Sequence, residues 1–253
     1  MKKRKKSVVD CVVYIGTPIL IFIIWQILCD KEVLNKAIVP SPVRVIEKSV
    51  ELIKGGILWE NLWASFRRVL VGFFFGAITG VAFGVLMGLF AKINEAVAIV
   101  FGVLRPIPTI GLVPLFIMLF GIGEKSKIIV IAIGTFWSVL LNTEHGITNI
   151  DIKYLEVANV LEKSRKTILM KVVFPSAIPS IFTGLRLGLS AAWKSVVAAE
   201  MLAAVRGIGY MISYAREMSQ PANMFVGLFT IGIIGVAIDS LILRLQNKII
   251  RWN

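Results

Sequence analysis

The chain has 253 residues, of which 57% are hydrophobic; its mean hydropathy is +0.83 and its formal net charge is +13. Soluble domains are about 45–50% apolar, so this composition excludes an ordinary soluble domain and predicts a chain that crosses a membrane several times. The charge does not indicate nucleic-acid binding, because the sequence has no aromatic-and-basic signature. Lys and Arg lie beside the apolar runs instead, where anionic lipid and the positive-inside bias favour them.

The N-terminus, MKKRKK followed by an apolar run, imitates a signal peptide. No small-x-small cleavage site follows, so we predict a retained first span over 12–28. Cys11 and Cys29 stand at its two ends and would lie about 27 Å apart on one helix. They cannot pair with each other at that distance, and neither a disulfide framework nor a metal site is expected.

We predict an all-α, polytopic bundle of about six membrane-spanning helices. Five cations precede the first span and only Lys31 and Lys36 follow it directly, which predicts that both termini and the loop at 145–177 are cytoplasmic. The predicted spans cover 12–28, 66–90, 96–120, 128–141, 178–199 and 225–243.

Two features lie between the first and third spans. The segment 40–62 is too charged to cross a membrane, and its apolar spacing predicts a short amphipathic helix at the outer interface. The second span carries a stripe of glycines at every fourth position, which lets another helix backbone approach closely. Tight packing is the favoured interpretation over a lining of the solute path; the glycines are Gly76, Gly80, Gly84 and Gly88.

The third span contains RPIPTIGLVP, residues 105–114. Its prolines remove backbone donors and bend a helix, and irregular backbone at membrane depth must be buried in protein or face a water-filled cavity. The bend either is purely structural or shapes a translocation path. Arg105 favours the second interpretation, because an ionisable group near a span needs a partner, a headgroup or a pore.

A basic segment, TNIDIKYLEVANVLEKSRKTILMKVVFP, follows the fourth span. Its apolar spacing predicts two short amphipathic helices, with Asp151 or Asn149 as N-cap of the first and Ser164 as N-cap of the second. Pro175 is expected to end the second helix, and Ser176 and Pro179 to begin the fifth span. These helices either rest on lipid headgroups or dock on another chain.

Catalytic machinery is missing from the sequence. GIGEKSK at 121–127 lacks the spacing of a phosphate-binding loop, the single His145 has no companions for a metal site, and no nucleophile stands beside a base. We therefore expect no cofactor and no enzymatic activity, and any energy for transport must come from an ion gradient or another chain.

The stretch EVANVLEKSRKTILMKVVFPSAIP, residues 156–179, resembles the EAA motif of binding-protein-dependent ABC importer permeases, in which Glu156, Ala158, Ser164, Val173 and Pro175 fall on matching positions. PSPVRV, SFRRVLVGF, RPIPTIGLVPLFIMLFGIGEKSKI and GLRLGLSAAWKSVVAAEMLAAVRGIGYMI are also similar. The resemblance covers nearly the whole chain and is closest to permeases for nitrate, sulfonate and taurine.

That resemblance implies a MetI-like fold, with a transport core over 66–253 and an N-terminal part over 1–65. It implies that the two short helices are coupling helices that dock on a cytoplasmic ATPase. It further implies a second permease copy, an extracytoplasmic solute-binding protein, membrane lipid around the spans and a bacterial cell membrane. The coupling residues would be Glu156, Val157, Ala158, Leu161, Glu162, Ser164 and Pro175.

The chain departs from the family at Glu162, where the motif has a glycine. That glycine allows a left-handed turn, and a glutamate there costs about 1–2 kcal/mol; either the turn has another geometry or Glu162 gains a basic partner.

Candidate residues of the solute path are Arg105, Pro108, Asn142, Trp193, Lys194 and Glu200. The other interpretation of these residues is structural pairing within the bundle. The predicted function is inward transport of a small anion of the sulfonate, taurine or nitrate type by alternating access, driven by a separate ATPase. The alternatives are an ABC permease for a vitamin precursor such as a pyrimidine, or an ion-coupled secondary transporter.

Overall fold

The computed structural model describes residues 8–249, and the side chains of most residues from 16 onward. The part it describes is helical apart from short connections. Two compact units divide the chain: residues up to Trp59 with Met211–Phe229, and Glu60–Tyr210 with the residues from Thr230 onward. The predicted division after residue 65 differs from this packing boundary and stays a prediction.

The first unit contains α1 (Val8–Asp30), α2 (Pro42–Lys54) and the residues on either side of the connection between α10 (Ile208–Glu217) and α11 (Pro221–Ile249). Aromatic rings join α1 to α11, with the Trp25 and Phe225 ring centroids 5.6 Å apart. Cys29 is buried and its thiol lies 3.8 Å from the carbonyl oxygen of Val39; the side chain of Cys11 lies outside the described residues. Ser41 caps α2, which is the predicted amphipathic helix.

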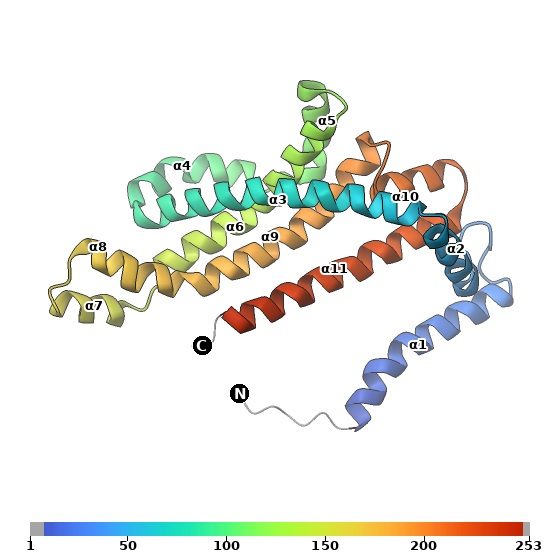
Figure 1. Cartoon of the computed structure of the whole chain (residues 1–253), viewed down its shortest axis with the longest axis horizontal. Coiled ribbons are helices and arrows are strands. Elements are labelled where there is room, and N and C mark those ends of the chain that lie inside the picture. Colours follow the sequence, from blue (N-terminus) through green and yellow to red (C-terminus); the bar gives the residue numbers. More distant parts are fainter. Residues whose placement is uncertain (1–7, 250–253) are drawn as a thin grey trace. The chain divides into compact units, whose positions relative to one another are not determined.

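The second unit is built on three long helices: α3 (Ile57–Leu89), α6 (Glu124–Thr148) and α9 (Phe174–Ala203). The last two run side by side in Figure 1 and pack along their lengths. Val69 of α3, Ile131 of α6 and Trp193 of α9 meet in a shared apolar cluster. The same unit contains α4 (Ala91–Leu104), α5 (Thr109–Phe120), α7 (Ile152–Val160), α8 (Arg165–Ile168) and the π-helical turn η1 (Leu169–Val173).

Among the described residues, four helices are long and apolar enough to cross a membrane: Ile57–Leu89, Glu124–Thr148, Arg165–Ala203 and Pro221–Gln246. The pair α4 and α5, bent by 92°, makes a fifth span if the two helices are counted together. Separately, residues 16–30 of α1 form a shorter apolar helix. The polytopic, all-helical prediction is confirmed, and the predicted spans correspond to these six elements.

The third span is not the continuous helix predicted for 96–120. It breaks after Leu104, and α5 begins at Thr109. Pro106 and Pro108 cause the break, because each lacks an N–H donor and Pro108 disfavours helical backbone at Ile107; Arg105, before Pro106, still has helical backbone. Pro114 is tolerated inside α5.

Two predicted boundaries are wrong. The residues 57–62, assigned to the interfacial helix, belong to α3, because a Gly55–Gly56 turn with Gly56 at φ 77° ends α2 first. Pro175 does not end a helix: α8, η1 and α9 form one helical run over Arg165–Ala203. Pro175 has no N–H to donate, and the π-helical turn stands directly before it. In this turn the Phe174 N–H donates to Leu169 O, five residues back, and a single π-helical turn of this kind can occur inside an α-helix without ending it.

Candidate functional site

The hairpin of α7 and α8 turns on Glu162 in left-handed backbone, at φ 52°. The Glu162 N–H donates to Asn159 O at 2.9 Å, and the Lys163 N–H donates to Ala158 O at 3.1 Å. This pair of hydrogen bonds is the Schellman arrangement that ends many helices, normally with glycine at the left-handed position. The turn therefore keeps the glycine geometry with a glutamate in it, and within the described residues Glu162 has no ion pair that compensates.

Caps and apolar contacts fix the two helices of this hairpin. The Asp151 side chain accepts from the Lys153 N–H, so Asp151 is the N-cap of the first helix and the alternative Asn149 is not. Ser164 Oγ accepts from the Thr167 N–H at 3.3 Å, which confirms the predicted N-cap of the second helix. On the inner side of the hairpin, partly buried side chains pack on a cluster of Ile147, Val173 and Ala177. The packed side chains include Leu155, Ile168 and Leu169. The hairpin is thus anchored to the neighbouring ends of α6 and α9, as Figure 1 shows.

The outer side of the hairpin exposes large apolar side chains. Tyr154 is 61% exposed, Val157 59% and Val160 81%. A hollow of about 830 Å³ opens between the helices, lined in part by Tyr154, Val157 and Leu161. An exposed apolar patch rimmed by charged groups indicates an interaction surface rather than a finished protein exterior.

The predicted coupling residues occupy different environments in this hairpin. Glu156, Val157 and Leu161 are exposed, whereas Ala158 is buried. Ser164 caps α8 and Pro175 stands inside the helical run. Only the exposed members are free to meet a partner, and the others shape the hairpin.

The glycine stripe of α3 lies against α6. An added methyl group at Gly84 would lie 2.6 Å from Thr143 Cβ, and one at Gly88 would lie 2.8 Å from Ile147 Cβ. Gly76 and Gly80 meet α6 in the same way, and Gly72 extends the stripe by one more turn. The two backbones approach so closely that side chains at these positions have no room.

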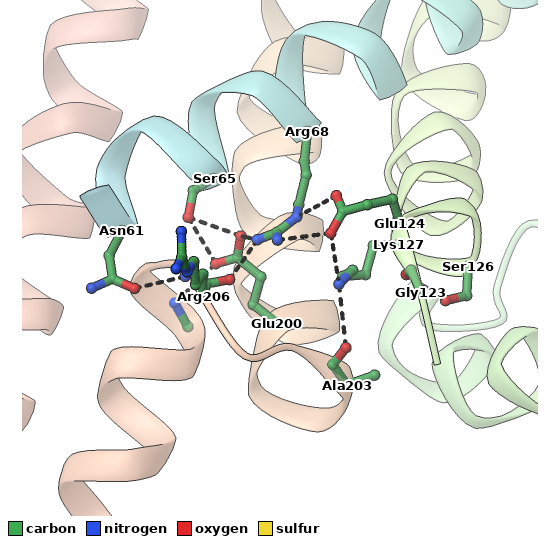
Figure 2. A network of polar contacts seen from close by, with 12 residues as sticks. Asn61, Ser65, Arg68, Gly123, Glu124, Ser126, Lys127, Glu200, Ala203 and Arg206 are labelled. Atoms are coloured by element: carbon green, nitrogen blue, oxygen red, sulfur yellow. Dashed lines mark hydrogen bonds and ion pairs between the residues drawn. The ribbon is translucent and has the colours of Figure 1, made fainter. Parts of the chain in front are cut away.

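A buried ion-pair network joins three helices at the end of α9 that lies away from the hairpin (Figure 2). Arg68 of α3 is its centre, with a side chain only 7% exposed. Its Nη1 donates to Glu200 Oε1 at 2.6 Å, and its Nε and Nη2 donate to both carboxylate oxygens of Glu124 at 2.8 and 2.9 Å. Lys127 adds a contact to Glu124 at 3.1 Å.

Glu200, fully buried, has further donors. Ser65 Oγ lies 2.8 and 2.9 Å from its two oxygens, and the Gly209 N–H donates to it at 3.0 Å. The connection between α9 and α10 is held by the same group, because Arg68 donates to Arg206 O and Asn61 accepts from the Gly207 N–H. A buried charge must be paired and hydrogen-bonded to be tolerated, and every oxygen of this carboxylate is.

Sequence reasoning identified Glu200 but missed Arg68, Ser65, Asn61 and Glu124 as its neighbours. Arg67 and Arg68 both counted as membrane-flanking cations. The available signal was an ionisable residue inside a span, which needs a counter-charge, but that counter-charge, Arg68, lies 132 residues from Glu200 along the chain. A second ion pair, between Arg186 Nε and Asp239 Oδ1 at 2.7 Å, joins α9 to α11.

The remaining candidate pathway residues fall into two groups. Trp193 is buried and donates to Ile231 O at 3.1 Å, and Asn142 donates to Ser138 O within α6. Arg105 and Pro108, at the break between α4 and α5, are exposed, and so is Lys194 on α9. Among the described residues no cluster of three or more His, Cys, Asp or Glu could hold a metal ion.

Comparison with known proteins agrees with this architecture. Residues 72–251 match the family described as binding-protein-dependent transport system inner membrane component. The chain is 37% identical, over 93% of its length and 85% of the relative's, to the putative aliphatic sulfonates transport permease protein SsuC of Bacillus subtilis.

Two further relatives have different substrates in their names. The nitrate import permease protein NrtB of Synechocystis sp. is 35% identical, with 91% of this chain and 86% of that protein covered. The taurine transport system permease protein TauC of Escherichia coli is 30% identical, with 94% and 89% covered.

Among solved structures, a chain of the inward-facing MetNI methionine ABC transporter superposes with a TM-score of 0.67 at 20% identity, and covers 76% of this chain and 95% of that one. This likeness concerns the fold. The family match, the three relatives and the MetI-like helical core together show that the chain belongs to the binding-protein-dependent transport system inner membrane components and is the permease subunit of an ABC importer.

Proposed function

We propose that the chain imports a small oxyanion by alternating access, driven by an ATPase that grips the α7–α8 hairpin. The family itself implies an ATPase and a solute-binding protein as partners. The observation that carries the coupling role is the continuous helical run Arg165–Ala203. At about 1.5 Å per residue it extends about 58 Å, so a displacement at the hairpin moves the far end of the same rigid element.

The exposed side chains of the hairpin support its assignment as the docking surface. Val157, Val160 and Leu161 offer apolar contacts, and Glu156 stands exposed among them. The inner side is anchored to α6 and α9, so a force on the outer side is passed to both helices rather than absorbed by a loose loop.

The substrate class follows from the relatives, which are named for aliphatic sulfonates, nitrate and taurine. Each is a small solute with a compact, anionic oxygen group. An ion-coupled mechanism lacks support from the carboxylates, because Glu200 and Asp239 both engage arginines.

The complete importer is proposed to contain two copies of this chain in a bacterial cell membrane, with lipid around the spans. Both termini and the hairpin face the cytoplasm in this arrangement, as the concentration of cations before the first span predicts. The network around Arg68 then lies near the outer surface.

Reversal of one exposed charge tests the docking assignment. Glu156→Lys leaves the fold unchanged because the side chain is exposed, and we expect at least tenfold weaker association with the co-encoded ATPase, about 1.4 kcal/mol, with a parallel loss of ATP-driven uptake. Glu60→Lys, an exposed charge at the opposite end of the core, is the control and should bind the ATPase normally. Retention of ATPase binding and uptake by Glu156→Lys would contradict the assignment.

A further inference from the structure

Two cations of the spanning helices, Lys194 and Arg105, have no ion pair in the part of the chain that the structure describes. The helices α6 and α9 are antiparallel, and their register can be followed through contacts: Lys127 Nζ lies 3.3 Å from Ala203 O, and a methyl group at Gly184 would lie 2.8 Å from Asn142 Cβ. Lys194 precedes Ala203 by nine residues, which is about 13 Å along a helix. With the hydrocarbon boundary taken at Ala203, the end of the spanning run, a core about 30 Å thick places Lys194 close to half depth.

The broken span reaches the same depth. Thr109, the first residue of α5, has its Oγ1 3.4 Å from Oγ of Ser195 on α9. This contact brings the break between α4 and α5 next to Lys194, and Arg105 stands four residues before Thr109 at the end of α4. Both cations are exposed, and neither has an ion pair within the described residues.

The carboxylates Glu200 and Asp239 of the spanning helices are already engaged. Arg68 neutralises Glu200, and Arg186 binds both oxygens of Asp239 at 2.7 and 2.9 Å. A second copy of this chain would have the same residues in the same pairs. In the proposed dimer, Glu200 and Asp239 of each copy are therefore taken by arginines and do not pair with Lys194 or Arg105, and a lipid-facing position for either cation is costly.

We propose that Lys194 and Arg105 flank the solute-binding position of the translocation path and attract a small monovalent oxyanion, a sulfonate or nitrate. This inference rests on the proposed function and adds to it the residues that select for negative charge. Secondary transporters place their solute sites at broken helices near the membrane midplane, and the break between α4 and α5 offers the same kind of irregular backbone here. The hydroxyl contact of Thr109 with Ser195 fixes the break against α9, and so holds the two cations in one region.

The experiment uses proteoliposomes that contain the complete importer: this chain, its ATPase and its binding protein. Methanesulfonate and nitrate are the probes, and uptake and ATP hydrolysis are measured together. For Lys194→Gln we expect at least a tenfold loss of uptake with the subunits still assembled, and for Lys194→Arg retention within about threefold, since a charged contact is among the stronger hydrogen-bonding interactions. Lys125→Gln, the same change at an exposed lysine near the start of α6, should have wild-type uptake.

A charge-specific variant separates attraction of the anion from helix packing. In Lys194→His the introduced imidazole gains its proton near pH ~6.5, so uptake relative to wild type should rise from pH 8 to pH 5.5. A purely structural role predicts the same relative uptake at both values.

The outcomes distinguish the two proposals. Loss in Lys194→Gln, retention in Lys194→Arg and pH-dependent recovery in Lys194→His support the anion site. If wild type imports either anion but Lys194→Gln does so within twofold of wild type, the site assignment is overturned while the proposed function stands. If assembled wild-type importer takes up neither anion, the proposed substrate class fails, and the site with it.

Discussion

The turn of the α7–α8 hairpin depends on one residue, Glu162. Glu162 adopts φ 52° although it carries a Cβ, and the strain is tolerated because two backbone hydrogen bonds close the turn. The left-handed position thus reflects the hydrogen-bond geometry at the end of α7 and does not require a glycine. A glycine would relieve the strain and lose more backbone entropy on folding.

The balance of these two effects is testable. Glu162→Gly should stabilise the hairpin against local opening by about 1 kcal/mol, which appears as slower amide hydrogen exchange over 158–163. Lys163→Gly is the matched control, because Lys163 is not in left-handed backbone and glycine there should speed exchange. Equal effects of the two glycines would show that strain at Glu162 is absent.

Elements pack here by close backbone approach. The stripe on α3 faces α6 over five glycines, from Gly72 to Gly88, and such contact replaces the hydrophobic driving force that is missing between helices in lipid. The span formed by α4 and α5 is not packed as a continuous helix, because the prolines interrupt the helix over 105–108. The break leaves polar groups beside α9.

An added methyl group on α3 tests how closely α3 and α6 pack. In Gly84→Ala the new Cβ would lie 2.7 Å from Leu140 O, a backbone atom that cannot turn aside, and overpacking of this kind costs about 1–3 kcal/mol. We expect a lower thermal unfolding midpoint in detergent. Gly102→Ala, in α4 with nothing within 4 Å of the added methyl, should leave the midpoint unchanged or raise it; a drop of equal size there would contradict the packing argument.

At the scale of the whole molecule, the second unit is tied at both ends of α9. One end is the hairpin with its apolar anchor, and the other is the ion-pair network that joins α3, α6 and the connection after α9. Helices fixed at both ends move as one body, and the proposed coupling needs such a body to pass a push on the hairpin to the far end of α9.

Removal of the central cation should release one of these ties. Arg68→Gln leaves the buried Glu200 carboxylate without its counter-charge and should lower the free energy of unfolding by about 3–5 kcal/mol; the double variant Arg68→Gln/Glu200→Gln should recover part of the loss. Arg44→Gln is the control, because the Arg44–Glu47 pair is 65% and 58% exposed and should change stability by less than about 1 kcal/mol. Thermal unfolding of the wild type, Arg68→Gln, Glu200→Gln and the double variant gives the coupling energy, and a value near zero would show that the network contributes no pairing energy.

The sequence by itself determined the membrane class, the positions of six apolar elements, the N-cap at Ser164 and the importer family, because these depend on local composition, spacing and an ordered motif. It did not determine the continuity of the helix through Pro175, since a π-helical turn is a choice of backbone hydrogen bonds that residue types do not specify. Nor did it determine the partners of Glu200, which come from helices far apart in the chain. Only the tertiary structure decided that Arg68 neutralises Glu200, that Arg186 neutralises Asp239, and that Lys194 and Arg105 have no counter-charge among the residues the structure describes, because a charge is paired by whatever the packed helices bring within reach.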